Sequence, residues 1–335
     1  MTLCIAWIRK VDESEELVFA TDSYLTGGER WKSIKLFELP RKDCLICFAG
    51  STSRAYPLIL NLISSINSND RLSDQRTDIY DVLAHLTELF SDLIKDIVIE
   101  VKGQDIDKLK GEAEFIFGGW SWQKQQFCIW HLYYSKDAKG FIFADRLTGS
   151  VRPHAIIGTK ESLADAKALL KKELDEDDED DRLLGGPFDM EPLKVLARMA
   201  RETKYGTIGG APQIAKVYKS GISEFFGIKR HEQYTLLGRK QNRFSKPSVR
   251  YIDLDTSGII EDQLPSHLTQ VDNTLFGDEL DFIQECYPEG KLKDQLSDQE
   301  KEKLHIILSD VAYRSFVDLN ESQAELSEEV ADKNE

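Results

Sequence analysis

The chain has 335 residues, which is enough for about two domains or for one large domain with an extension. Hydrophobic residues make up 41% and charged residues 30%, and no apolar run approaches the roughly 20 residues of a membrane-spanning helix, which excludes a helical membrane protein. The 43 Lys and Arg against 59 Asp and Glu give a net charge of −16, which disfavours a general nucleic-acid-binding protein.

The cysteines predict free thiols in a reducing cytoplasm. Five cysteines cannot all pair within one chain, and the opening MTLCIAWIRK lacks the features of a signal peptide. Cys44 and Cys47 form a C-x-x-C, but they lie in an apolar run typical of a strand, where residues three apart point to opposite faces. A zinc site also needs a second pair of ligands, which is missing. We therefore expect two buried thiols, and no metal or cofactor.

The first hundred residues predict strands followed by two helices. Short apolar runs indicate strands over 2–8, 17–22, 33–39 and 44–49, and their short connections favour one antiparallel meander. Dense apolar residues over 56–66 predict a helix buried on more than one side. Over 79–97 one apolar stripe predicts an amphipathic helix that comprises Ile79, Val82, Leu83, Leu86, Phe90, Leu93, Ile94 and Ile97.

The order of elements then repeats. Strands are predicted over 113–118, 125–134 and 140–145, helices over 161–174 and 190–204, and a strand over 213–218. Groups of strands alternating with pairs of helices favour an α+β fold, in which helices cover sheets, over a repeating βαβ fold.

Two segments have a strong charge bias. Residues 173–181 contain eight acids in nine positions, which predicts a solvated loop; calcium binding is the less favoured alternative because regular ligand spacing is absent. Residues 229–250 contain seven Lys or Arg against one Glu. We expect this basic loop to face an acidic neighbouring subunit or the chain's own acids, in preference to nucleic acid.

The C-terminal residues differ from the rest of the chain. We expect a first domain over 1–255 with an acidic insertion near 173–186, a helical extension over 256–320 and a disordered acidic tail over 321–335. Ser297 and Glu300 form a capping box that begins a helix. The apolar positions of that helix are Leu304, Ile307, Leu308, Val311 and Phe316.

The N-terminus is the strongest candidate for chemistry, since the common catalytic motifs are absent and the six histidines are scattered. Thr2 follows the initiator Met1, and a small second residue generally permits removal of the methionine. A terminal threonine then carries a hydroxyl and an α-amine whose ordinary pKa is about 8, so one residue supplies both nucleophile and base. A lysine ammonium held by a carboxylate would support both groups.

Residues suited to these roles follow in order. Asp22 ends the second predicted strand and Lys35 lies in the third, so a meander brings both beside Thr2. Gly50 begins the turn before a helix, where backbone N–H groups are free to bind an oxyanion. Each residue also has a purely structural interpretation: Thr2 as a permissive second residue, Asp22 in a turn, Lys35 facing solvent and Gly50 at a helix entry.

Together these stretches resemble the proteasome-type N-terminal nucleophile (Ntn) hydrolases, including the bacterial ancestral β-subunit homologues. The resemblance rests on Thr2 in MTLCIAW, ATDS around Asp22, KLFEL beginning at Lys35 and FAGSTSRA around Gly50. It continues through FIFGGW, HAIIGT and IGGAPQIAKVYKSG to about residue 225, and it does not include the C-terminal extension. It implies a four-layer αββα sandwich and a supporting hydroxyl at Thr159.

The resemblance implies a threonine-type peptidase or amide hydrolase in a homo-oligomeric, proteasome-like assembly. Its substrate would be a peptide or a small amide, and an ATPase or another protein would be its partner. One segment departs from the family pattern, because Tyr205 and Ile208 stand where active members place an aspartate and a serine, with Thr207 as a partial substitute. The alternative is therefore a non-catalytic scaffold or regulatory subunit. Retention of Met1 would block the α-amine of Thr2 and exclude the hydrolytic mechanism.

Overall fold

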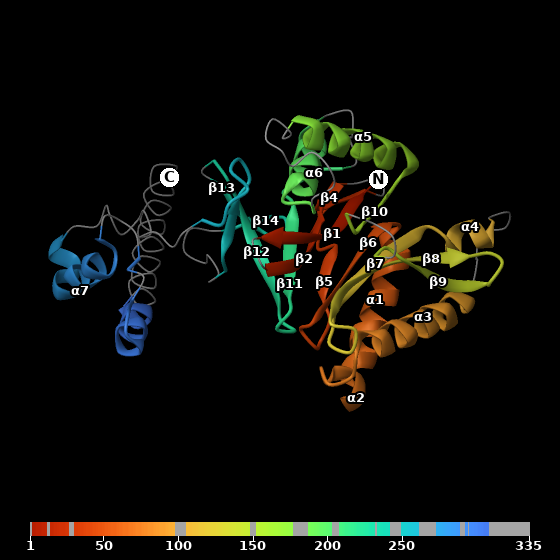
Figure 1. Cartoon of the computed structure of the whole chain (residues 1–335), viewed down its shortest axis with the longest axis horizontal. Helices are drawn as coiled ribbons and strands as arrows, with labels where there is room; N and C mark the ends of the chain where they lie inside the picture. The colour runs from red at the N-terminus through yellow and green to blue at the C-terminus, as the bar shows by residue number, and fades with distance from the viewer. Residues whose placement is uncertain are drawn as a thin grey trace, which may run out of the picture. The chain divides into compact units, whose positions relative to one another are not determined.

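The computed structural model describes residues 2–11, 14–26, 30–97, 105–147, 152–176, 187–202, 208–231, 233–241, 249–260, 273–288, 292–293 and 295–307. The chain divides into two compact units (Figure 1). The first comprises Met1–Lys240 and Val249–Gly258, and the second comprises Gln241–Ser248 and Ile259–Glu335.

The larger sheet of the first unit has eight strands. All its pairs are antiparallel except the last strand, which lies parallel to β12. The order is β10 (His154–Gly158), β1 (Leu3–Val11), β2 (Ser14–Thr21), β11 (Gln213–Tyr218), β12 (Ser223–Arg230), β13 (Gln233–Leu236) and β14 (Arg239–Lys240), with β15 (Tyr251–Asp253) on β12.

The second sheet has five antiparallel strands in sequence order. They are β5 (Leu36–Glu38), β6 (Cys44–Gly50), β7 (Ala113–Ser121), β8 (Gln126–Ser135) and β9 (Gly140–Asp145). A two-stranded ribbon of β3 (Tyr24–Thr26) and β4 (Arg30–Lys32) lies between β2 and β5 in the chain.

The helices of this unit occur in two groups along the chain. α1 (Thr52–Asn67), α2 (Asp70–Ser73), α3 (Ile79–Lys95) and α4 (Ile106–Lys110) lie between β6 and β7, and α5 (Lys160–Glu176) and α6 (Glu191–Arg201) lie between β10 and β11. Within the described ranges, no helix combines the length and the apolar character needed to cross a membrane.

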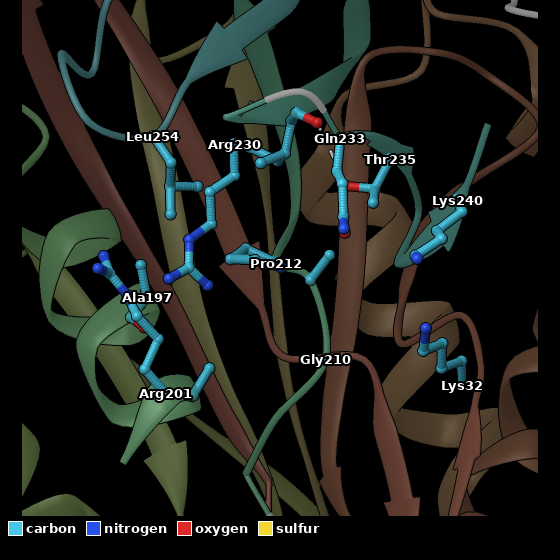
Figure 2. Close-up of a pocket in the computed structure, with 13 residues that line it drawn as sticks. Lys32, Ala197, Arg201, Gly210, Pro212, Arg230, Gln233, Thr235, Lys240 and Leu254 are labelled. Carbon is cyan, nitrogen blue, oxygen red and sulfur yellow. Dashed lines mark hydrogen bonds between the residues drawn. The ribbon is translucent and has the colours of Figure 1, made fainter. Parts of the chain in front are cut away.

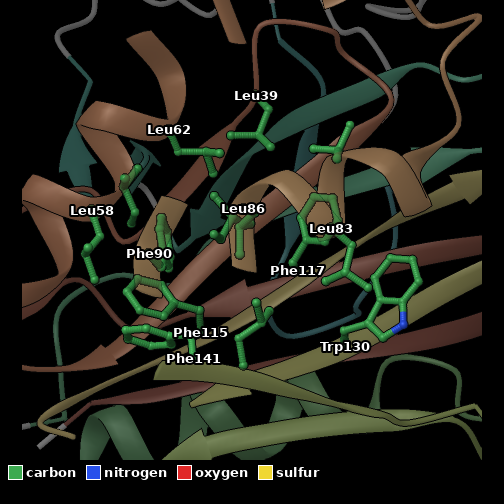
Figure 3. Close-up of a cluster of buried hydrophobic side chains, with 14 of the residues drawn as sticks. Leu39, Leu58, Leu62, Leu83, Leu86, Phe90, Phe115, Phe117, Trp130 and Phe141 are labelled. Carbon is green, nitrogen blue, oxygen red and sulfur yellow. The ribbon is translucent and has the colours of Figure 1, made fainter. Parts of the chain in front are cut away.

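Three groups of buried apolar side chains hold these elements together. In the first, Leu62, Leu86 and Phe90 of the helices α1 and α3 pack against Phe115 and Trp130 of the five-stranded sheet (Figure 3). This burial accounts for the apolar stripe of α3, because the positions that recur every three or four residues are those that contact the sheet.

The second group joins the eight-stranded sheet to α5 and α6, and includes Leu170, Leu196 and Ile214. The third is shared between the sheets, and includes Phe19 of β2 and Ile129 of β8. Each sheet therefore contributes buried apolar side chains to one group shared with helices and to the group shared between the sheets. The prediction of an α+β protein with helices on antiparallel sheets is confirmed.

The prediction of one four-strand meander is wrong. β1 and β2 pair with each other in the larger sheet, and β5 and β6 pair with each other in the smaller sheet. The reason is that β10 occupies the free edge of β1 and β11 occupies the free edge of β2, so neither edge is open to β5. The sequence signal of the four strands was correct, but their pairing depends on strands far along the chain.

Three further predictions need correction. α1 buries one side only, since Leu60 is 60% exposed. The acidic run does not begin as a loop, because α5 continues to Glu176; residues 177–186 lie outside the described residues. The basic segment was expected to be a loop, but its described part forms the end of β12 with β13 and β14. The expectation that it faces the chain's own acids is confirmed for two of its cations, since Arg250 pairs with Glu224 and Lys229 pairs with Asp253.

The prediction that the cysteines are free, and that Cys44 and Cys47 are buried, is confirmed. All five thiols are free and buried. Cys44 faces the helices and Cys47 faces the other sheet, as expected of residues three apart on a strand. Burial raises the pKa of both thiols well above the ordinary value.

The second unit contains α7 (Asn273–Cys286), which lies within the helical extension expected over 256–320, and a helical segment over 298–307. Its capping box is confirmed, since the Ser297 backbone N–H donates to the Glu300 carboxylate at 2.7 Å and the Glu300 N–H donates to the Ser297 hydroxyl at 3.3 Å. Leu304 and Ile307 pack against Ile283. Leu308, Val311, Phe316 and the expected tail lie outside the described residues.

Candidate functional site

Thr2, Asp22 and Lys35 meet at the beginning of β1. The Lys35 ammonium donates to the Thr2 hydroxyl oxygen at 3.0 Å and to the Asp22 carboxylate at 2.8 Å. The Asp22 and Lys35 side chains are fully buried, and Thr2 is 5% exposed. The structural alternative of a solvent-facing lysine is therefore wrong. A buried lysine of this kind needs an anionic partner, and Asp22 supplies it.

The Asp22 carboxylate is surrounded by donors. One oxygen accepts from the Leu3 N–H at 3.2 Å besides Lys35, and the other accepts from the Tyr24 and Gly209 N–H groups, both at 3.2 Å. Burial raises the pKa of Asp22 above its ordinary value, while the Lys35 charge and the backbone donors oppose that rise. Because all four partners are donors, the ionised form is the one that satisfies them.

Lys35 reaches the other two residues across the interface between the sheets. It directly precedes β5 of the smaller sheet, whereas Thr2 and Asp22 flank the ends of β1 and β2 in the larger sheet. The expectation that Lys35 lies on a strand of the same sheet as Thr2 and Asp22 is therefore wrong. The three side chains nevertheless come together, because residues of both sheets pack in one shared apolar group.

Gln213 holds the Lys35 segment in place, and the sequence analysis missed it. This fully buried side chain accepts from the backbone N–H groups of Lys35 at 2.9 Å and Leu36 at 3.3 Å, and it donates to the Ser33 carbonyl at 2.5 Å. The available signal was a glutamine at the start of a strand in which Lys216 is the only other polar side chain apart from the terminal Tyr218. Such a side chain fixes where the lysine enters the interface between the sheets.

The segment after α6 supports Asp22 through its backbone. The Gly209 N–H donates to the carboxylate, and its carbonyl accepts from the Ser23 and Tyr24 N–H groups at 3.0 and 3.1 Å. Ile208 is buried among apolar side chains, so it offers no hydroxyl at the family's serine position. Tyr205 and Thr207 lie outside the described residues.

Gly50 lies at the end of β6 with a φ of +102°, a conformation that favours glycine. A Cβ there would lie 1.9 Å from the Glu112 carbonyl oxygen, so both the conformation and the space require glycine. The Phe48 carbonyl, two residues earlier, accepts a hydrogen bond from the Cys4 thiol at 3.0 Å, which places this strand end beside β1. Among the described residues, no hydrogen bond joins Gly50 to Thr2.

Thr159 follows β10 and immediately precedes α5. The Thr159 and Ser162 hydroxyl groups form a hydrogen bond of 2.9 Å, and the Ser162 N–H donates to the Thr159 hydroxyl oxygen at 3.4 Å. No hydrogen bond joins Thr159 to Thr2 in the part of the chain that the structure describes. Gly158 does lie against the terminus, since a Cβ there would be 2.5 Å from the Thr2 carbonyl oxygen. Ser162, which is 1% exposed, was also missed by the sequence analysis.

Comparisons with known proteins give weak similarities only. No family model matches the chain, and no curated protein matches it. Among solved structures, it is similar to Anbu (ancestral beta-subunit) from Yersinia bercovieri, with 17% identity, a TM-score of 0.45, and coverage of 67% of this chain and 86% of that chain. The helical assembly of the Anbu complex from Pseudomonas aeruginosa has 19% identity and a TM-score of 0.47, with coverage of 67% of this chain and 85% of that chain. Anbu from Hyphomicrobium sp. strain MC1 has 16% identity and a TM-score of 0.41, with coverage of 64% of this chain and 82% of that chain.

Proposed function

We propose that this protein is an amide hydrolase whose nucleophile is the hydroxyl of Thr2 after removal of Met1. One observation carries the proposal: the buried Lys35 ammonium contacts both the Thr2 hydroxyl at 3.0 Å and the Asp22 carboxylate at 2.8 Å. A structural role for a buried ion pair needs only the two charged groups. The contact with the threonine hydroxyl is what a mechanism requires in addition.

In this mechanism the free α-amine of Thr2 takes the hydroxyl proton as the oxygen attacks the amide carbon of the substrate. The Lys35 charge stabilises the developing negative charge and favours the unprotonated amine. We place the Gly50 N–H as donor to the carbonyl oxygen. The amine then transfers its proton to the leaving nitrogen, and a water molecule hydrolyses the resulting ester to regenerate the hydroxyl.

We further propose a four-layer αββα sandwich for the first unit and a homo-oligomer as the active form. The three groups of buried side chains support the layers, since they join helices to sheet, sheet to sheet and sheet to helices. Large exposed apolar side chains support burial against other copies; among them Trp31 is 65% exposed and Leu60 is 60% exposed. A peptide is the favoured substrate, with a small amide as the alternative.

A second candidate function is a non-catalytic scaffold or regulatory subunit. Two observations favour it: the Thr159 hydroxyl is engaged with Ser162, and an apolar Ile208 stands at the position of the family's serine. Both observations weaken the expectation that a second polar group, besides Lys35, supports the Thr2 hydroxyl. This candidate keeps the ion pair as a structural feature and predicts no reaction at the N-terminus.

Intact-mass analysis before and after reaction with a threonine-selective electrophile, such as an epoxyketone, separates the two. Hydrolase function predicts the loss of Met1 and one adduct at Thr2, which Thr2→Ser retains and Thr2→Ala abolishes. Thr87→Ala, which changes a threonine of α3 that donates to the Leu83 carbonyl, is the matched control and should label normally. Retained Met1, or a free Thr2 without any adduct, would refute the hydrolase proposal.

A further inference from the structure

A cavity of about 450 Å³ lies in the first unit (Figure 2), and its lining residues do not include Thr2, Asp22 or Lys35. Its walls come from α6, from the turn before β11 and from the end of the sheet formed by β12, β13 and β14. This volume falls within the range of about 300–1,000 Å³ that is typical of small-molecule sites. None of the residues that line it has a role in the proposed hydrolysis.

Four cations line this cavity, and no carboxylate does so among the described residues. They come from four elements, and Figure 2 shows Arg230 extending toward Pro212, and Lys240 and Lys32 extending into the space between their strands. In a chain with a net charge of −16, such a grouping of one sign is unexpected. The four are Lys32 of β4, Arg201 of α6, Arg230 of β12 and Lys240 of β14.

These cations lack anionic partners within the described residues. Other basic residues nearby are paired, as Lys229 is with Asp253, whereas the hydrogen bond of Arg201 within the described ranges goes to the backbone carbonyl of Ala197 at 3.1 Å. All four are exposed, so water solvates them now. An anion with several oxygens would accept charge-assisted hydrogen bonds from them and would reduce their mutual repulsion.

The floor of the cavity has a different character. Pro212, Ala197, Ile228 and Leu254 are buried there and are apolar. The buried Thr235 hydroxyl is directed to the Ile228 carbonyl at 3.4 Å. A ligand that fits both parts has a compact apolar portion for the floor and charged oxygens for the rim.

We propose that this cavity binds a small organic polyanion: a compact apolar group that carries a phosphate chain or several carboxylates. The proposal is independent of catalysis at Thr2. The cavity borders Gly210, which directly follows the residue whose N–H supports Asp22.

Isothermal titration calorimetry on the full-length protein, without divalent cations and at low and physiological salt, tests the proposal. The probes are ATP, which has an aromatic base that can pack on apolar side chains and a triphosphate; inorganic tripolyphosphate; citrate; and adenosine. We expect one ATP per chain, weaker binding of tripolyphosphate and citrate, and no binding of adenosine. The order of tripolyphosphate and citrate distinguishes a phosphate site from a carboxylate site.

Variants place the binding in this cavity. Arg230→Gln and Lys240→Gln should each weaken ATP binding by about tenfold, the loss expected for one charge-assisted hydrogen bond. Arg71→Gln is the matched control, because Arg71 is 75% exposed on α2 and does not line the cavity; it should leave affinity within about twofold. Thr2→Ala should bind ATP normally, so the failure of the proposed hydrolase would not affect this result.

Two outcomes would overturn the proposal. One is the absence of ATP, tripolyphosphate and citrate binding at millimolar concentration and low salt in protein that circular dichroism shows to be folded. The other is an equal loss of affinity in Arg230→Gln, Lys240→Gln and Arg71→Gln, which would indicate diffuse attraction by surface charge. Tighter binding of an acidic peptide or of nucleic acid than of any small probe would likewise assign the surface to a macromolecular partner instead.

Discussion

Replacing Lys35 by methionine tests the central ion pair. Methionine keeps an unbranched chain of similar length and removes the charge, so it leaves Asp22 fully buried without its cation. Breaking a buried pair in this way typically costs about 3–5 kcal/mol. Three backbone N–H groups still donate to the carboxylate, at 3.2 Å each, so we expect the lower part of that range.

The loss of stability should depend on pH. Burial already raises the pKa of Asp22, and removal of Lys35 removes the largest opposing cause, so the folded-state pKa rises further above its unfolded value. The folded variant then takes up a proton that the unfolded chain does not hold. Its deficit relative to the wild type is therefore greatest above that folded pKa, and it shrinks as the pH falls through it.

Urea denaturation at several pH values, with the midpoint and the slope analysed together, measures this effect. Lys10→Met, at an exposed position on β1, is the matched control and should change the free energy of unfolding by less than about 0.5 kcal/mol. The double variant Lys35→Met with Asp22→Asn should recover part of the loss. A neutral-pH loss for Lys35→Met no larger than that of the control would refute the buried ion pair.

Three further predictions concern other parts of the molecule. Gly50→Ala should lower the free energy of unfolding by about 1–3 kcal/mol or more, because φ is +102° and Glu112 leaves no space for a Cβ. Urea denaturation measures this loss, and an unchanged midpoint would contradict the geometry. Gln213→Leu should lower the free energy of unfolding by about 1–3 kcal/mol in the same assay, because the buried N–H groups of Lys35 and Leu36 lose their acceptor. It should also slow electrophile labelling at Thr2. An unchanged stability and labelling rate would exclude a positioning role for Gln213. The thiols of the folded protein should resist Ellman's reagent at pH 8, since all five are buried and burial raises the pKa of Cys128 to about 11. In denaturant all five should react. Rapid labelling of the folded protein would be inconsistent with this packing.

The sequence by itself determined most of the local structure. Apolar runs located β1, β2, β5 to β9 and β11, and helical periodicity located α1, α3, α5 and α6, because burial imposes a pattern on the apolar residues; β3, β4, β10 and β12 to β15 were not predicted. The capping box at Ser297 was equally local. The chemistry of a terminal threonine also led directly to Asp22 and Lys35, since a nucleophile and base within one residue need one carboxylate and one cation nearby.

Only the tertiary structure decided how these elements pair. The edges of β1 and β2 are taken by β10 and β11, which lie more than a hundred residues later in the chain, and this directs β5 and β6 into a second sheet. The Lys35 side chain consequently reaches Thr2 across the interface between the sheets. The supports from Gln213 and Gly209 depend on the same long-range pairing. A periodic pattern records that a face is buried, but it does not record which other element covers that face.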